Sequence, residues 1–174
     1  MLIPYVPMDG FTQPTRGSDQ AAGWDLYAAA DTELRPFEPK LVPLAFSAAV
    51  PDGHVMLLVP RSSVGLKRRL ILPNSVGVID SDYRGQWMGI FTWIPHPSEV
   101  LDGRLVKYED PILFRPEFSF EFKPNAKATY LIQKGERIAQ ALLVEYKEQD
   151  WRRVDALPET QRGSGGFGST DSRG

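Results

Sequence analysis

The sequence contains no cysteine and only two histidines, His54 and His96, among its 174 residues. Disulfide bonds, thiolate metal sites and cysteine nucleophiles are therefore excluded. Two histidines also do not favour a histidine-rich metal site. Chemistry that depends on sulfur or on a histidine cluster is not expected.

Long apolar runs are missing as well. No stretch is long and apolar enough to span a bilayer. Residues 1–7 lack the basic stretch followed by an apolar run that marks a secretory signal. We therefore expect a soluble, cytoplasmic protein.

The chain has no excess of basic residues. Its formal net charge is -2 and its sequence pI is about 5.7. A surface that binds a polynucleotide backbone normally gives a clear basic excess, so nucleic acid is not expected as the main ligand. A small, highly charged ligand held by a few arginines is compatible with this balance.

Turn-forming residues are abundant, with fifteen prolines and fifteen glycines. Few stretches keep an apolar period near 3.6, and the chain length suits one globular domain. Many short strands separated by turns suit a sandwich or jelly roll, so an all-β fold is expected. Strands are predicted at 23–29, 41–50, 54–60, 70–72, 76–79, 87–93, 129–132 and 137–146, and a short helix at 63–69.

The segment 76–85, VGVIDSDYRG, predicts a tight turn with Asp80 at its mouth and Tyr83 on the far side. We expect a hairpin here. A carboxylate backed by Val78 and Ile79 should be partly dehydrated, which would strengthen it as a base towards a nearby water. Taken alone, the same residues favour an ordinary turn followed by a strand aromatic.

Four further segments give this turn a context. They are AAGWDLYAA at 21–29, PRSSVGLK at 60–67, GERIAQ at 135–140 and RGSGGFGST at 162–170. Together with 76–85 these segments, in this order, resemble the five motifs of the trimeric dUTPase family. The resemblance extends from about residue 15 to 170, apart from a stretch after Trp93 that looks inserted.

The resemblance implies a distorted jelly roll assembled as a homotrimer, with active sites at subunit interfaces. It divides the chain into a jelly-roll domain at 1–158 and a mobile, glycine-rich C-terminal lid at 159–174. An inserted β arm is expected at about 95–125, where aromatic and polar residues alternate. Some phage members of the family carry an insertion at this place. The arm would either bind a protein partner or only add trimer contacts.

The implied activity is Mg²⁺-dependent hydrolysis of dUTP to dUMP and pyrophosphate. This reaction would limit uracil incorporation into DNA and supply dUMP for thymidylate synthesis. Asp80 would activate the water that attacks the α-phosphorus. Asp25 would hold the Mg²⁺ ion through its water molecules. Trp24 stands where the family more often has tyrosine or phenylalanine, which keeps an aromatic ring.

The resemblance also assigns substrate contacts by residue type. Arginines offer planar donors for phosphate oxygens, and fixed hydrogen bonds can distinguish uracil from cytosine or thymine. The implied contacts are Arg61, Ser62, Ser63, Gln140 and Arg162 for the phosphates, Asn74, Gly77, Val78 and Ile79 for uracil, Tyr83 for deoxyribose, and Gly166, Phe167, Gly168 and Ser169 in the closing lid. Gln86 and Asp171 depart from the family's usual glutamate and glycine.

Three alternatives stay open. A dCTP deaminase shares this fold and an Arg-Ser-Ser segment, but it would need a catalytic glutamate and would lack the 162–170 tail. A regulatory protein could keep the nucleotide site as a sensor and dock a partner through the arm. A kinase-like phosphate loop in the tail is the weakest idea, because no Gly-Lys-Ser/Thr follows the glycines.

Overall fold

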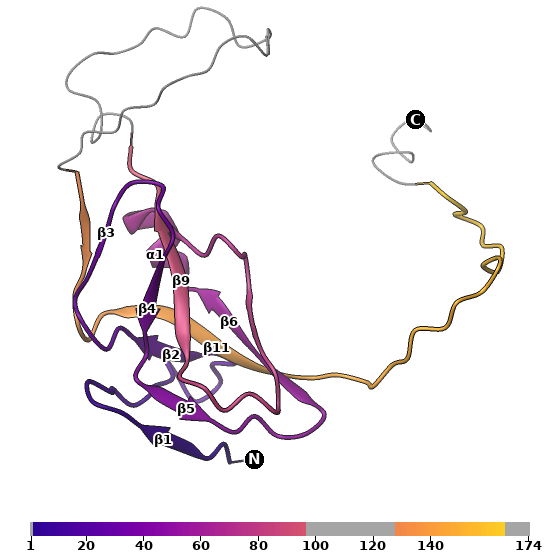
Figure 1. Ribbon diagram of the computed structural model, residues 1–174, viewed down its shortest axis with the longest axis horizontal. Coiled ribbons are helices and arrows are strands. Elements are labelled where there is room, and N and C mark those ends of the chain that lie inside the picture. Colours follow the sequence, from indigo (N-terminus) through magenta and orange to yellow (C-terminus); the bar gives the residue numbers. More distant parts are fainter. Residues whose placement is uncertain (1, 97–127, 166–174) are drawn as a thin grey trace, which may run out of the picture.

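The computed structural model describes residues 2–96 and 128–165, and its regular elements are short strands and one short helix, joined by turns and loops (Figure 1). The strands are β1 Tyr5–Pro7, β2 Trp24–Tyr27, β3 Thr32–Leu34, β4 Lys40–Pro43, β5 Phe46–Ala48, β6 His54–Pro60, β7 Leu70–Ile71, β8 Gly77–Ile79, β9 Met88–Trp93, β10 Tyr130–Ile132 and β11 Arg137–Glu145. A short helix, α1 Ser62–Arg68, follows β6. The expected all-β class is confirmed.

Four antiparallel groups of strands make up this part of the chain. The largest has the order β2-β11-β6-β8, and a second has the order β4-β9-β7. The pairs β1-β5 and β10-β3 complete the set. The long strand β11 is central because it pairs with β2 on one side and with β6 on the other.

The core lies between these sheets and consists largely of strand residues that point inward, with Val64 from α1 and Leu44 from the loop between β4 and β5. Burial of such side chains is the main stabilising contribution. The largest fully buried side chains are Phe91, Leu26, Leu34, Leu44, Leu58, Leu70, Ile132, Ile138, Val42 and Val64. No helix in the described ranges is long and apolar enough to cross a membrane.

Two sequence expectations about strands need correction. The single strand expected at 41–50 is two strands, β4 and β5, because Ala45 adopts a left-handed conformation with φ of 58°. The hairpin expected at 76–85 is also wrong. Strand β8 pairs with β6, whereas β9 pairs with β4 and β7, so the turn at Ser81 and Asp82 carries the chain from one sheet to another.

The C-terminal segment leaves the body of the molecule after β11 (Figure 1). Residues 147–164 are exposed, and no strand is assigned in this stretch. The predicted arm at 95–125 and the lid residues Gly166, Phe167, Gly168 and Ser169 lie largely or entirely outside the described residues.

Candidate functional site

A hollow of about 290 Å³ lies beside β8. Six of the residues that line it have roles assigned in the sequence analysis, namely Asn74, Gly77, Val78, Ile79, Asp80 and Tyr83. Gln86, Trp87 and several apolar residues close the remainder. The structure therefore brings together the residues that the sequence assigns to base, sugar and attacking water.

A tightly turned loop shapes one wall of this hollow. The Ser75 N–H donates to the Leu72 carbonyl at 2.8 Å, and Ser75 adopts a left-handed φ of 63°. The Asn74 amide Nδ2 donates to the Val76 carbonyl at 3.3 Å. A left-handed conformation costs energy in a non-glycine residue and persists only where surrounding contacts hold it. The two hydrogen bonds supply such contacts, so the loop leads into β8 in one defined conformation.

Strand β8 has a main-chain edge available for a ligand. Its three residues pair with Leu58, Leu57 and Met56 of β6, and β8 is the last strand in the order of its sheet. An edge strand presents unpaired N–H and C=O groups on its outer side. Those groups can meet the donors and acceptors of a planar base.

Asp80 follows β8 directly and is exposed, as is Val78 with 62% of its surface accessible. The expectation that Asp80 is partly dehydrated is therefore wrong for a single chain. Only Ile79 of the two flanking apolar residues is buried. The side chain of Asp80 is free to meet a ligand or a neighbouring molecule.

A second group of polar residues surrounds Asp25, which is only 3% exposed on β2. Arg61 Nε lies 2.9 Å from Asp25 Oδ1, and Gln140 Nε2 donates to the same oxygen at 3.2 Å. Arg137 Nη1 lies 3.4 Å from Oδ2. The Arg61 Nε–H meets no acceptor in hydrogen-bond geometry within the described residues, so its contact is an ion pair only.

Strand pairing explains why this group forms. Gln140 stands opposite Asp25 in the β2–β11 register, and β6 on the other side of β11 delivers Arg61 at its end. The sequence assigned Arg61, Gln140 and Asp25 roles but gave none to Arg137. Its position in the GERIAQ segment, three residues before Gln140, was the available signal.

Ser62 and Ser63 open helix α1 next to this group. No side chain in the described residues caps the helix, and its first turn contains no acidic residue. A helix N-terminus without a cap leaves main-chain N–H groups for other acceptors. Ser62 and Ser63 therefore lie beside Arg61 at an end of the helix that is compatible with an anion.

The two groups are far apart within one chain. Because Ile79 pairs with Met56, the register places Asp80 opposite Val55 of β6. Arg61 lies past the other end of β6, about 20 Å away at ~3.3 Å per residue. One chain does not bring Asp80 to the Arg61 group.

Arg162 is not near either group. Its Nε donates to the Gly165 carbonyl at 2.9 Å within a turn of the exposed C-terminal segment. That segment runs away from the body (Figure 1). The predicted closure of Arg162 over phosphate would need a different arrangement of the tail or a second subunit.

The residues around Asp25 suit a metal ion that arrives with its ligand. The described residues contain no group of three or more histidine or acidic side chains that could hold an ion directly. Two hydrogen bonds and the ion pair with Arg61 already engage the Asp25 carboxylate, which leaves it little capacity for direct ligation. A contact through water from Oδ2 is compatible with this arrangement, and hard phosphate oxygens suit Mg²⁺.

A β-rich fold with an open hollow and a separate arginine group defines a protein that can bind a small anionic ligand. A family model described as dUTPase matches residues 9–95 and 113–171. The deoxyuridine 5'-triphosphate nucleotidohydrolase of Dictyoglomus turgidum is 32% identical over 174 residues, covering 98% of this chain and 97% of its own. The protein of the same name from Mus musculus is 36% identical over 159 residues, covering 91% and 78%. The chain belongs to the dUTPase family.

Solved structures agree with this assignment. The Staphylococcus bacteriophage 80alpha dUTPase with dUpNHpp superposes with a TM-score of 0.74 at 26% identity, covering 97% of each chain. The distorted jelly roll implied by the resemblance is thus confirmed. The family model leaves residues 96–112 unmatched, a range that falls within the segment predicted to be inserted.

Proposed function

We propose that this protein hydrolyses dUTP to dUMP and pyrophosphate. The observation that carries the proposal is the hollow in which Asn74, β8, Asp80 and Tyr83 meet. A base, a sugar and an attacking water can be placed in one such site. Membership of the dUTPase family and the analogue dUpNHpp in the 80alpha structure support this choice of substrate.

Uracil would be selected by the main-chain edge of β8 and the Asn74 amide. Fixed donors and acceptors reject a base whose pattern differs, by a larger factor than an apolar pocket can. Cytosine presents its groups in the wrong order, and thymine adds a methyl group. Tyr83 would pack its ring on the deoxyribose, so a ribose hydroxyl would be buried without a partner at a cost of roughly 1 to 3 kcal/mol.

The hydrolytic step would start from a water held by Asp80. The carboxylate takes a proton from the water while the water oxygen bonds to the α-phosphorus. The bond from the α-phosphorus to the bridging oxygen breaks, and the electron pair leaves with pyrophosphate. Phosphoryl transfer of this kind depends mainly on positioning and on neutralising charge.

Arg61, Ser62, Ser63 and Gln140 would hold the phosphate oxygens, and Arg162 would close over the end of the chain. Gly166, Phe167, Gly168 and Ser169 would complete the lid, with Phe167 stacked on uracil. Mg²⁺, when bound to the phosphates, supplies additional neutralisation of their charge. Asp25 would contact its waters while keeping Arg61 and Arg137 in place.

The active site would be assembled between subunits of a homotrimer. The separation of about 20 Å between Asp80 and the Arg61 group supports this, because one substrate can reach both only if they come from different chains. Exposed Val78 beside Asp80 would then be covered by a neighbour. A carboxylate that is open in one chain would become enclosed in the assembly.

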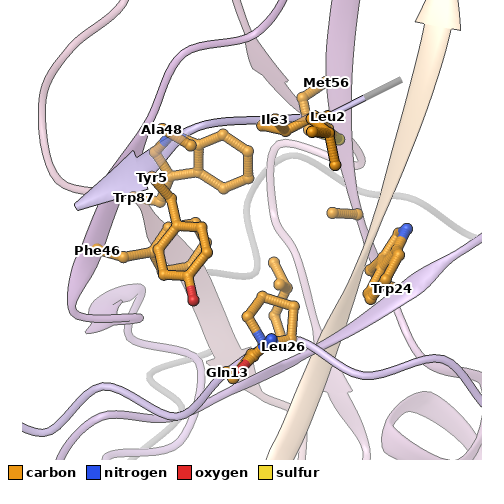
Figure 2. Close-up of a pocket in the computed structure, with 12 residues that line it drawn as sticks. Leu2, Ile3, Tyr5, Gln13, Trp24, Leu26, Phe46, Ala48, Met56 and Trp87 are labelled. Carbon is orange, nitrogen blue, oxygen red and sulfur yellow. The ribbon is translucent and has the colours of Figure 1, made fainter. Parts of the chain in front are cut away.

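Uncovered apolar surface supports the same assembly. A hollow of about 310 Å³ contains Leu2, Ile3, Tyr5, Phe46, Trp24 and Trp87 among its lining residues. Figure 2 shows Trp24 on one side of it and Tyr5, Phe46 and Trp87 on the other. The C-terminal segment also exposes Trp151, Val154 and Leu157, by 96%, 52% and 83%. An apolar hollow and large exposed apolar side chains are compatible with burial in an assembly.

One assay tests the activity directly. Pyrophosphate release is measured with Mg²⁺ for dUTP, dTTP, dCTP and UTP at equal concentrations. We expect release from dUTP to exceed the others by several orders of magnitude. Release of ammonia from dCTP, or equal turnover of all four nucleotides, would contradict the proposal.

A further inference from the structure

One ion pair joins helix α1 to the start of β11. Arg68 Nη1 donates to Glu136 Oε2 at 2.7 Å, across 68 positions of sequence. The side chains are 33% and 22% exposed, so water screens their attraction only in part. Burial raises the pKa of Tyr130, and the charges of Arg68 and Glu136 act on it in opposite directions.

Little of helix α1 is buried. It has seven residues, a length that is not stable as an isolated helix. Val64 is its only buried residue, whereas Leu66 on the same helix is 83% exposed. The main chain just after α1 is also attached to the segment that follows β9, because the Arg69 carbonyl accepts a hydrogen bond from the Ile94 N–H at 2.9 Å. Arg68 is thus a side-chain contact that attaches the C-terminal end of α1 to the start of β11.

Glu136 is itself fixed to the strand that carries Asp25. Its carbonyl accepts from the Ala28 N–H at 2.9 Å, and the Gly135 N–H donates to the Ala28 carbonyl at 2.8 Å. The next residue, Arg137, contacts Asp25. The ion pair thus connects the helix that begins with Ser62 and Ser63 to the frame around Asp25.

We propose that Arg68 and Glu136 form a positioning pair that fixes the tilt of α1 for phosphate binding. This inference rests on the proposed function, because it takes Ser62 and Ser63 as phosphate contacts. Neither member of the pair touches the substrate. Loss of the pair would let the helix pivot about Val64 and move both serines away from the polyphosphate.

The test compares Arg68→Met with Glu136→Met, using the full-length protein. Affinity for dUpNHpp is measured by calorimetry, and KM and kcat are measured with dUTP. Both variants should weaken dUpNHpp binding and raise KM by about tenfold, the order expected for loss of one charge-assisted contact. We expect kcat to stay within about twofold, because Asp80 is not affected. Binding of deoxyuridine, which has no phosphate, should not change.

The two variants alter net charge in opposite directions, which separates positioning from long-range electrostatics. A pure charge effect would weaken binding in Arg68→Met and tighten it in Glu136→Met. Lys67→Met removes an equal charge from an exposed neighbour on α1 and should retain wild-type affinity. The double variant should bind no more weakly than either single one, because the pair acts as a unit.

If either methionine variant does not fold, Arg68→Lys and Glu136→Asp replace it, and they should show an intermediate loss. Unchanged dUpNHpp affinity in folded variants, additive losses, or opposite effects of the two single variants would overturn the proposal. A lower thermal midpoint with unchanged KM would overturn it as well. Failure of the proposed function is distinguishable, because then the wild-type protein itself would not release pyrophosphate from dUTP.

Discussion

The ring of Tyr83 lies directly over Gly85. A β-carbon built on Gly85 would stand 2.6 Å from Tyr83 Cζ, closer than any real contact of this kind. The Tyr83 hydroxyl donates to the Gln86 carbonyl at 3.1 Å, which holds this same end of the ring in place. The glycine is therefore required for the place of Tyr83 at the edge of the hollow.

Gly85→Ala should displace Tyr83 and weaken selection of the sugar. We expect kcat/KM for dUTP to fall by roughly ten- to a hundredfold, since small misplacements in a site carry large penalties. The ratio of kcat/KM for dUTP to that for UTP should fall as well. Pyrophosphate release from each nucleotide measures both values. Gly17→Ala is the matched control, because a β-carbon there meets no atom within 4 Å. Retained discrimination in Gly85→Ala would contradict the role of the ring.

Asp80→Asn should separate activity from stability. The side chain is exposed, so the free energy of unfolding should change by no more than about 0.5 kcal/mol. Turnover should fall by about a hundredfold to ten thousandfold, the usual contribution of a general base, while dUpNHpp still binds. Circular dichroism and steady-state kinetics check the two parts. Wild-type turnover would refute the assignment.

Asp25→Asn should impair both activity and stability, whereas Asp80→Asn should impair activity alone. The carboxylate is buried and faces Arg61 and Arg137, so its loss leaves two cations without their partner. We expect about 1 to 3 kcal/mol of lost stability together with a higher KM for dUTP. Urea unfolding and kinetics measure both, and Asp19→Asn on an exposed loop serves as the control. Full stability in Asp25→Asn would show that the ion pairs contribute little.

The sequence pattern located the central strands well. Runs such as 54–60 and 137–146 combine β-branched and apolar residues between turn signals, and they correspond to β6 and β11. The helix at 63–69 also lies within one residue of α1. Strands β1 and β3 were missed, although β8 and β10 are equally short and lie within predicted runs. All three residues of β1 are exposed, so that strand has no buried face to give an alternating pattern.

Pairing between strands could not be predicted from local patterns. The turn at 76–85 has the composition of a hairpin, yet its two flanking strands join different sheets because long-range partners on β6 and β4 decide the pairing. The contact of Arg137 with Asp25 depends on the same long-range register of β2 and β11. The order of the motifs identified the family and the candidate residues. It did not predict the distance between Asp80 and Arg61 in one chain.

Deletion of residues 162–174 should remove activity without lowering stability. Residues 162–164 are exposed, and Arg162 and Gly163 form hydrogen bonds to Gly165 and Thr160 within the tail itself. If the tail closes over bound nucleotide and excludes water, turnover should fall at least a hundredfold. Differential scanning calorimetry should give the same midpoint as the full chain. A truncated protein with full activity would contradict the lid.

The exposed indole of Trp151 should contribute to assembly. Sedimentation velocity should give a particle with three times the 19.5 kDa mass of the chain. Trp151 is 96% exposed in one chain, and burying a large apolar side chain is worth about 1.5 to 3 kcal/mol, or roughly ten- to a hundredfold in affinity. Trp151→Ser should therefore dissociate at higher protein concentration than the wild type, whereas Arg152→Ser on the same segment should not.

Because the substrate would need Asp80 and Arg61 from different chains, specific activity should fall in parallel with the trimer fraction as Trp151→Ser is diluted. A wild-type monomer with full activity would contradict both the assembly and the shared site.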